Sequence, residues 1–249
     1  MSIKGNIVRF VESALNVRVV RPHYVTRLFE EMHLKRLLST FNVDCVFDIG
    51  ANIGQYGEML RTRAGYRGDI ISYEPNPGAA SLLRQNTQVD PKWHVVEIGL
   101  DRTPGQRPFN IMASDQCSSF LTPSENETRL VAHWNKIEQR ITVETQTLAH
   151  EFADWSGRLQ FRCPFLKMDT QGNDTAIVQG GEGVIRHFIG IQTELAIKRS
   201  YEGAHNFDDA IQYLRSLGFE LSALVPNNEG FFPQLIEIDA ILIRNDLMA

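Results

Sequence analysis

Apolar positions along most of the chain alternate between short continuous runs and runs with helical spacing. From residue 43 the apolar runs "VDCVFDI" and "DIISYE" are each followed by a helix-like stretch, "GQYGEMLRTRA" and "PGAASLLRQNTQ", and then comes "HVVEIGL". The series resumes with "PFLKMD", a helix from about Thr175, "FIGIQTEL", the helix-like "FDDAIQYLRSLG", and finally "FELSALV" and "IEIDAILIR". Strands that alternate with helices predict right-handed crossovers and a mostly parallel sheet. Because no helix separates the last two runs, we expect the last strand to be antiparallel.

Two regions depart from this alternation. Residues 3–41 carry apolar residues at helical spacing, and Pro22 is expected to separate two helices there. We expect a helical extension over 1–41 that packs on a main domain over 42–249, with a cap, a dimer arm or a membrane-surface helix as alternatives. In the middle of the chain, "QRPFNIM" and "QRITVETQTL" predict an inserted β-hairpin. The polar segment between them is expected to be a lid or a surface helix.

Composition narrows the class of protein. The chain has 249 residues, 43% of them hydrophobic, which suits an α/β domain with a sizeable core. Its formal net charge is -5, whereas a nucleic-acid binder would normally carry a basic excess, so we expect no nucleic-acid partner. Three scattered cysteines without CxxC spacing indicate a reduced, cytoplasmic setting and no zinc site, and Cys45 is expected in the core. No window reaches the ~18 apolar residues that a membrane span needs.

A glycine-containing loop follows the first predicted strand in "VFDIGANIGQYG". Ligands of open α/β sheets bind at the carboxyl ends of the strands, where Gly50 and Gly54 permit close approach and positive φ and Asn52 tolerates the same geometry. A dinucleotide fold would instead show GxGxxG, and Asp48 would repel a pyrophosphate. The loop therefore favours a nucleoside ligand that has positive charge and no phosphate, and S-adenosylmethionine fits that description.

The second predicted strand ends on an acid. Glu74 closes "ISYE" and can accept hydrogen bonds from both hydroxyls of a ribose. Pro75 ends the strand, and Asn76 can start the next helix as its N-cap. An exposed strand-end acid would explain Glu74 alone, but its combination with the glycine loop favours a nucleoside site.

The third predicted strand end, "EIGLD", would lie beside the adenine. Ile98 and Leu100 could sandwich the ring, and Asp101 could reach the exocyclic amine. A strand followed by a turn explains these residues equally well.

Six segments together, "FDIGANIGQY", "YEPNP", "IGL", "SSF", "LKMDTQGND" and "IDAILIR", resemble the FkbM-type S-adenosylmethionine-dependent methyltransferases over about residues 41–245. The resemblance implies a Rossmann-like class I methyltransferase fold: a seven-stranded, mostly parallel sheet with an antiparallel last strand. It also implies methyl transfer, usually to an oxygen of a sugar, glycan or polyketide-type acceptor.

The resemblance also assigns roles by motif position. The cofactor loop would contain Asp48, Gly50, Asn52, Gly54 and the following Tyr56, while Glu74 would hold the ribose and Asp169 would stand beside the reacting methyl. The family's usual segment reads like K-x-D-V-E-G-x-E. Here Gln171 replaces a carboxylate with an amide, and Asp174 is a shortened form of the second acid.

Three residues are candidates for catalysis. Asp169 could be the general base for an acceptor hydroxyl, or it could orient the methionine amine or a loop amide. Glu194 at the end of the fifth strand could bind an acceptor hydroxyl, or pair with Lys198 or Arg199. His205 could act as a base at neutral pH, or be an exposed loop histidine.

The acceptor itself is expected to be a small molecule or a glycan. Aromatic rings can cover the apolar faces of a sugar, although ordinary loop packing explains them as well. Small hydroxyls can reach the site, although they could equally cap a turn. The candidates are Ser118, Ser119, Tyr201, Phe231 and Phe232.

Two further functions stay open alongside methyl transfer. One is a nicotinamide-dependent oxidoreductase, against which the loop spacing and Asp48 argue. The other is a non-catalytic nucleoside-binding subunit of an assembly, and a homo-oligomer is compatible with the sequence. No required metal is expected, because Glu194 has no paired acid after the fifth strand.

Overall fold

The computed structural model describes residues 24–124, 136–198, 201–226 and 233–248. The helix expected before Pro22, most of the segment expected to be a lid or surface helix, and Phe231 and Phe232 therefore lie outside the described residues.

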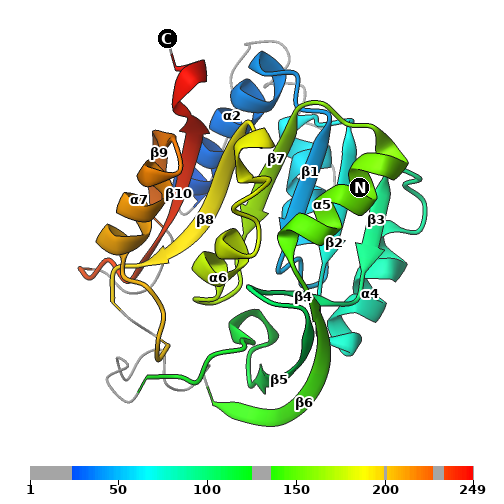
Figure 1. The fold of residues 1–249 in the computed structure, drawn as a ribbon, viewed down its shortest axis with the longest axis vertical. Coiled ribbons are helices and arrows are strands. Elements are labelled where there is room, and N and C mark those ends of the chain that lie inside the picture. The colour runs from blue at the N-terminus through cyan, green and yellow to red at the C-terminus, as the bar shows by residue number, and fades with distance from the viewer. Residues whose placement is uncertain (1–23, 125–135, 199–200, 227–232, 249) are drawn as a thin grey trace, which may run out of the picture.

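A seven-stranded sheet forms the centre of the fold (Figure 1). Its strands stand in the order β3-β2-β1-β7-β8-β10-β9, and β10 runs antiparallel to both of its neighbours while the other pairs are parallel. The predicted sheet with an antiparallel last strand is confirmed. The strands are β1 Cys45–Ile49, β2 Asp69–Tyr73, β3 Trp93–Val96, β7 Pro164–Met168, β8 Gly190–Ala196, β9 Phe219–Pro226 and β10 Glu237–Arg244.

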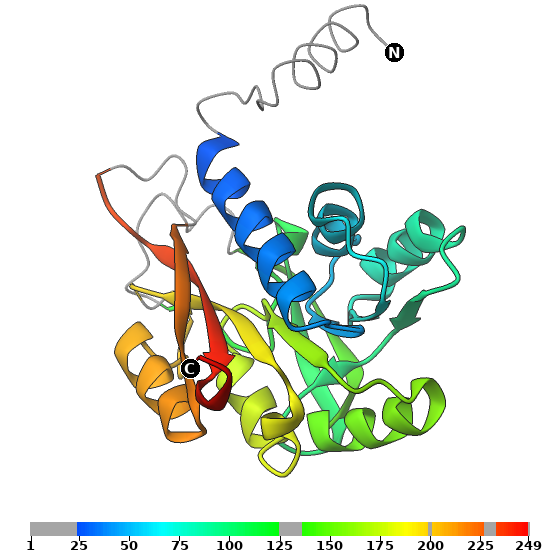
Figure 2. The same ribbon diagram turned by 90° about the horizontal axis from the view of Figure 1, so that it is seen from above.

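Helices cover both faces of this sheet (Figure 2). One face carries α2 Val25–Thr40, α3 Gln55–Met59 with the π-helical turn Leu60–Ala64 that continues it, and α4 Pro77–Thr87. The other carries α5 Leu148–Leu159, α6 Asp174–Gln179 and α7 Phe207–Ser216. Short 3-10 turns occur at Asp115–Cys117, Ile185–His187 and Asn245–Leu247.

Helix α5 is an element that the sequence patterns did not predict. Thr147 caps it by accepting the His150 N–H at 3.2 Å. Its Leu148 and Trp155, which lie two turns apart, are buried against the sheet. That spacing is the signal that could have revealed the helix.

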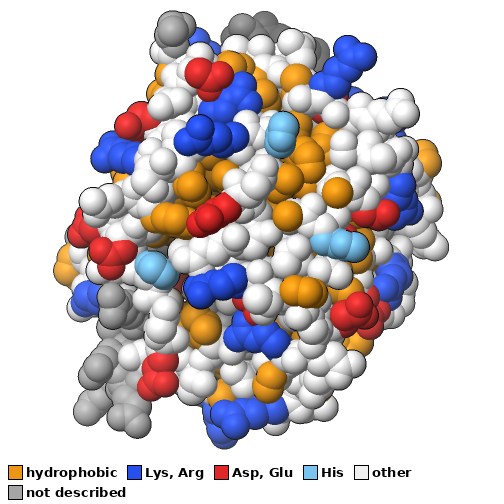
Figure 3. All heavy atoms as spheres, in the orientation of Figure 1, with side chains coloured by type: hydrophobic (Ala, Val, Ile, Leu, Met, Phe, Trp, Pro, Cys, Tyr) orange, Lys and Arg blue, Asp and Glu red, His pale blue; other side chains and the backbone are white. Residues whose placement is uncertain are grey.

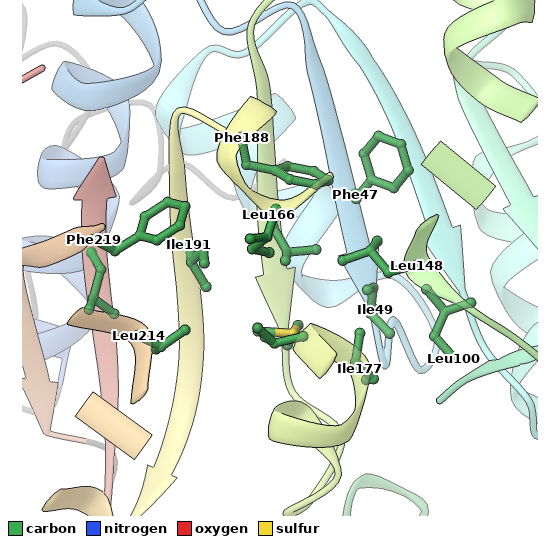
Figure 4. Packing of buried hydrophobic residues seen from close by; sticks show 14 of the residues in the cluster. Phe47, Ile49, Leu100, Leu148, Leu166, Ile177, Phe188, Ile191, Leu214 and Phe219 are labelled. Atoms are coloured by element: carbon green, nitrogen blue, oxygen red, sulfur yellow. The ribbon is translucent and has the colours of Figure 1, made fainter. Parts of the chain in front are cut away.

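Alternate strand residues supply the two cores, as expected for a sheet buried on both faces. Phe47 and Leu166 belong to the core under α5, α6 and α7, where the Phe188 ring meets the Phe47 ring edge-on at 5.4 Å between centroids (Figure 4). Val46 and the α2 residue Leu34 belong to the core on the opposite face. Cys45 is buried, as predicted, and has no disulfide partner.

A second, three-stranded sheet lies beyond the carboxyl ends of the main strands (Figure 1). It consists of β4 Gly99–Leu100, β5 Gly105–Met112 and β6 Ile137–Gln146, and β5 pairs antiparallel with β6 as the predicted hairpin requires. The prediction of "HVVEIGL" as one strand was wrong, because Gly99–Leu100 leaves the main sheet and pairs with β6. Gly99 allows this path, since a Cβ there would stand 2.4 Å from the Phe120 ring.

Helix α2 shares a core with the sheet. Leu34, Leu37 and Leu38 are buried against it, and His33 Nε2 lies 2.9 Å from the Ser222 Oγ of β9. The described part of the N-terminal region thus packs on the rest of the fold, whereas the division of the chain at residue 41 stays a prediction.

Basic and acidic side chains are interspersed on the face of the molecule shown in Figure 3, with apolar side chains between them. That face therefore presents no single-sign electrostatic field. Within the residues that the structure describes, no helix has the length and apolar character to cross a membrane.

Candidate active site

A cavity of about 790 Å³ opens at the carboxyl ends of β1, β2, β7 and β8, and α2 and the second sheet complete its walls. Among the sequence-derived candidates, its lining includes Gly50, Asn52, Tyr56, Glu74, Pro75, Leu100, Ser118, Asp169 and Glu194. The other described candidates, which are Asp48, Gly54, Asn76, Asp101, Ser119, Tyr201 and His205, do not line it.

The glycine loop has the predicted backbone geometry. Gly50, Asn52 and Gly54 have φ values of 76°, 49° and 99°. Position 50 has room only for glycine, because a Cβ there would stand 1.9 Å from the carbonyl oxygen of Asp169. The loop after β1 is therefore locked against the end of β7.

Glu74 is buried at the cavity wall. Its Oε2 accepts the Asn52 N–H and its Oε1 accepts the Asn76 N–H, both at 2.8 Å. Burial raises the pKa of Glu74 to about 7, and these two N–H donors act against the shift. Because each carboxylate oxygen can accept two hydrogen bonds, the group can still accept from two ligand hydroxyls. Asn76 caps α4 through the Gly78 N–H at 3.0 Å, as predicted.

A polar row crosses four strands beneath the loop. It consists of Ser72, Asp48, Lys167 and Gln192, which are successive register partners on β2, β1, β7 and β8. Asp48 is 0% exposed; its Oδ1 lies 3.1 Å from Lys167 Nζ, and its Oδ2 accepts the Ser72 hydroxyl at 3.0 Å. Burial lowers the pKa of Lys167, but the Asp48 and Asp169 carboxylates outweigh burial and raise it. The negative charge of Asp48 is thus balanced within the protein, so the argument that it selects a cationic ligand was wrong.

The polar row also ties α2 to the site. Tyr56 donates its hydroxyl to Gln192 Oε1 at 2.9 Å, and Gln192 Nε2 donates to Glu30 Oε1 at 2.7 Å. Burial raises the pKa of Glu30 above its ordinary value. Sequence reasoning missed Glu30, Lys167 and Gln192 as site residues. The available signal is that Lys167 is the one polar residue of β7 and that Gln192 begins a run of three polar residues in β8.

Asp169 and Glu194 meet at the cavity through Gln171. The Gln171 Nε2 donates to Asp169 Oδ1 at 3.0 Å and to Glu194 Oε2 at 2.6 Å. Lys167 Nζ lies 4.0 Å from Asp169 Oδ2, and the Asp169 side chain is 39% exposed. Burial, followed by the charge of Asp169, raises the pKa of Glu194 well above its ordinary value. Two of the three predicted catalytic residues therefore share one end of the cavity.

Asp174 forms hydrogen bonds with Thr170 and Thr193, which are the chain neighbours of Asp169 and Glu194. It is buried; its Oδ2 accepts the Thr193 hydroxyl at 2.5 Å, and its Oδ1 accepts the Thr170 N–H at 3.1 Å and the Thr170 hydroxyl. Burial raises the pKa of Asp174. Among the described residues, no group of three histidine, cysteine or acidic side chains is arranged to hold a metal ion.

Asp101 has another role than the one predicted. Its carboxylate pairs with Arg107 and accepts the Arg102 N–H at 2.7 Å. Because the side chain does not line the cavity, the predicted adenine contact has no support. Ile98 and Leu100 do line the cavity.

Ser119 and Tyr201, which were predicted to contact the acceptor, make hydrogen bonds within the protein instead. The Ser119 hydroxyl is buried and donates to the Gln171 carbonyl at 2.9 Å. The Tyr201 ring is buried, with its hydroxyl 2.8 Å from the Cys117 carbonyl oxygen and 3.0 Å from Gln171 Oε1. A buried ring cannot cover a sugar face. The Ser118 Oγ accepts the Met112 N–H at 3.2 Å at the cavity wall.

His205 lies apart from the cavity. It is exposed and lines a separate hollow of about 30 Å³. Because His205 does not line the cavity, the structure gives no support to it as a base for chemistry there.

Comparisons with known proteins agree with this architecture. The 2-O-methyltransferase NoeI of Sinorhizobium fredii is 26% identical over 209 residues, which are 80% of this chain and 79% of that protein. The solved structure of methyltransferase FkbM from Methylobacillus flagellatus KT is similar with a TM-score of 0.52 at 12% identity. That alignment covers 81% of this chain but 44% of the solved one, so the chain spans less than half of its length.

A family model provides the wider assignment. The model described as "Methyltransferase FkbM domain" matches residues 48–221, a span that begins at the buried acid of β1 and ends within β9. It includes the glycine loop, Glu74 and the cluster of Asp169, Gln171 and Glu194. Because this match covers well over half of the chain, the protein belongs to the methyltransferase FkbM domain family.

Proposed function

We propose that this methyltransferase uses S-adenosylmethionine and methylates a hydroxyl group on a sugar, glycan or secondary-metabolite acceptor. The observation that carries the proposal is the partly exposed Asp169 carboxylate, which faces the same cavity as the ribose candidate Glu74. The printed name of the relative NoeI, a 2-O-methyltransferase, supports oxygen as the acceptor atom.

The cavity residues fit the proposed cofactor. Glu74 has acceptor capacity for two ribose hydroxyls, and Ile98 and Leu100 offer apolar surface for an adenine. Because Asp48 pairs with Lys167, a positively charged amino acid portion would instead face other acidic side chains of the cavity lining, which include Asp115 and Asp239. When bound, S-adenosylmethionine supplies an activated methyl group on a sulfonium.

In this proposal the protein aligns the acceptor and removes its proton. An acceptor hydroxyl that donates to Asp169 transfers its proton to that carboxylate while its oxygen takes the methyl group. Asp169 Oδ1 accepts from Gln171, so Oδ2 is the oxygen that serves as base. The raised pKa of Glu194 favours its protonated form, which can donate a hydrogen bond to another acceptor oxygen. The two carboxyl groups thus take different roles because their environments differ.

The direct test is methyl transfer from a cofactor labelled with carbon-13 in the methyl group. The full chain would be incubated with panels of nucleotide sugars, glycans and small secondary metabolites. We expect a labelled O-methyl signal by NMR on members of one acceptor class. Label on nitrogen or carbon, or no transfer to any class while other methyltransferases label the same panels, would contradict the proposal.

Cofactor affinity should depend on pH through Glu74. Ionised Glu74 accepts from ribose hydroxyls, and its pKa is raised to about 7, so protonation below that value removes acceptor capacity. Since only about a tenth of a carboxyl group is ionised one unit below its pKa, we expect affinity to fall about tenfold between about pH 8 and about pH 6. Calorimetry measures this slope. Glu74→Gln should bind weakly at both pH values, and an unchanged slope in that variant would assign the pH dependence to another group.

A further inference from the structure

The Gln171 side chain bridges two carboxyl groups at the end of the cavity. Its NH₂ group has two hydrogens, and Asp169 and Glu194 each accept one, at 3.0 and 2.6 Å. Its Oε1 lies 3.0 Å from the Tyr201 hydroxyl, whose one hydrogen is shared between this oxygen and the Cys117 carbonyl oxygen at 2.8 Å. The reversed amide would set its oxygen against two carboxyl groups and its NH₂ toward Tyr201. The two carboxyl acceptors therefore favour the orientation with the NH₂ group toward them.

The backbone holds the same side chain in place. Gln171 has φ of 53°, a left-handed conformation that is uncommon for residues other than glycine, and Ser119 donates its hydroxyl to the Gln171 carbonyl at 2.9 Å. Tyr201 is itself buried against Met112 of β5. Ser119, from the segment after β5, and Tyr201, from the segment after β8, thus both contact Gln171. A residue that several contacts hold in an uncommon backbone conformation is typical of a functional site.

We propose that Gln171 is a positioning residue, whose amide holds one oxygen of Asp169 and one of Glu194 in place for the acceptor while Tyr201 fixes the direction of that amide. This inference rests on the proposed function, because it assigns a task to the Asp169 and Glu194 pair in methyl transfer. It leaves Asp169 Oδ2 as the oxygen that is free of the amide.

Charge explains why an amide suits this position. The groups that face the pair are Lys167 from β7, Asp174 from α6, and Glu237 and Asp239 from β10. Lys167 is the one cation among them, and Asp48 already shares its charge. A glutamate at position 171 would place a third carboxyl group between two others. Like charges at that distance cannot all ionise, so the cluster would bind a further proton.

Activity measurements separate positioning from simple space filling. In Gln171→Glu we expect kcat to fall about 10- to 100-fold and the acidic limb of the kcat/KM profile to move up by about one pH unit or more. Gln171→Met has a similar size and no donor, so it should lower kcat by a comparable factor without that upward shift. Tyr201→Phe should lower kcat about fivefold, because one orienting hydrogen bond is lost. Cofactor affinity by calorimetry should stay at the wild-type value in all three variants.

The matched control is Gln160→Glu. Gln160 has the same φ of 53° but lies at the end of α5, outside the cavity lining, so this variant adds the same charge in the same backbone conformation. It should keep the wild-type pH profile. Wild-type kcat in Gln171→Met, or identical pH profiles for Gln171→Met and Gln171→Glu, would overturn the proposal.

An unfolding measurement needs no acceptor and therefore keeps this inference distinct from the proposed function. In Gln171→Glu the added carboxyl group raises the folded-state pKa of the cluster above its unfolded value. Stability is then retained at low pH and lost as pH rises through the folded-state pKa. We expect the deficit of Gln171→Glu relative to Gln171→Met, in urea unfolding, to grow from about pH 5 to about pH 8. A pH-independent deficit would overturn the bridging role even if methyl transfer were established.

Discussion

Replacing Asp169 with asparagine is expected to lower kcat for methyl transfer about 10²- to 10⁴-fold while cofactor affinity stays close to wild type. The side chains are nearly isosteric, and Gln171 can still bond the retained carbonyl oxygen. What is lost is the Oδ2 carboxylate oxygen that takes the acceptor proton. Single-turnover rates with labelled cofactor, together with calorimetry, measure the two quantities separately.

The same experiment decides between the two roles considered for Asp169. If the carboxylate instead holds the amine of the methionine portion, Asp169→Asn will weaken cofactor binding and leave the rate at saturation unchanged. Asp154→Asn is the matched control, because Asp154 is exposed on α5, pairs with Arg158 and does not line the cavity. It should change neither quantity.

Replacing Lys167 with methionine is expected to destabilise the fold by about 3–5 kcal/mol at neutral pH. The ammonium of Lys167 is the cation 3.1 Å from the fully buried Asp48 carboxylate. Methionine fills similar space but leaves that charge with only the Ser72 hydroxyl as a hydrogen-bond partner in the polar row. Urea unfolding measures the loss.

A double variant identifies the cause of that loss. The double variant Lys167→Met with Asp48→Asn removes both charges and should recover part of the stability. Lys92→Met, at an exposed position, should stay within about 0.5 kcal/mol of wild type. A double variant less stable than Lys167→Met alone would contradict this account of the ion pair.

The features that the sequence predicts well are local in the chain. The order of strands and helices follows from periodicity, and the loop geometry at Gly50, Asn52 and Gly54 follows from residue types that tolerate positive φ. Glu74 reaches the cavity because it directly follows a strand of a parallel sheet. Each of these inferences needs only one segment at a time.

The features that were missed depend on partners distant in sequence. Asp48 meets Lys167 because β1 and β7 are neighbours in one register, and no pattern within either strand contains that register. Likewise, Tyr201 is buried because it packs against Met112 of β5, and Asp101 pairs with Arg107 of the same strand. Glu30 accepts a hydrogen bond from Gln192, and this contact can be predicted only if the position of α2 against the sheet is known. Sequence reasoning thus found the edge of the sheet that carries the site, while tertiary contacts decide which side chains face it.

The central claim is that the cavity beside the glycine loop and Glu74 binds S-adenosylmethionine. Titration calorimetry of the full chain with S-adenosylmethionine and, separately, with NAD tests it most directly. The account predicts saturable heat from S-adenosylmethionine at a single class of sites, weakened by Glu74→Gln, and no comparable heat from NAD. Saturable binding of NAD without binding of S-adenosylmethionine at millimolar concentration would contradict it.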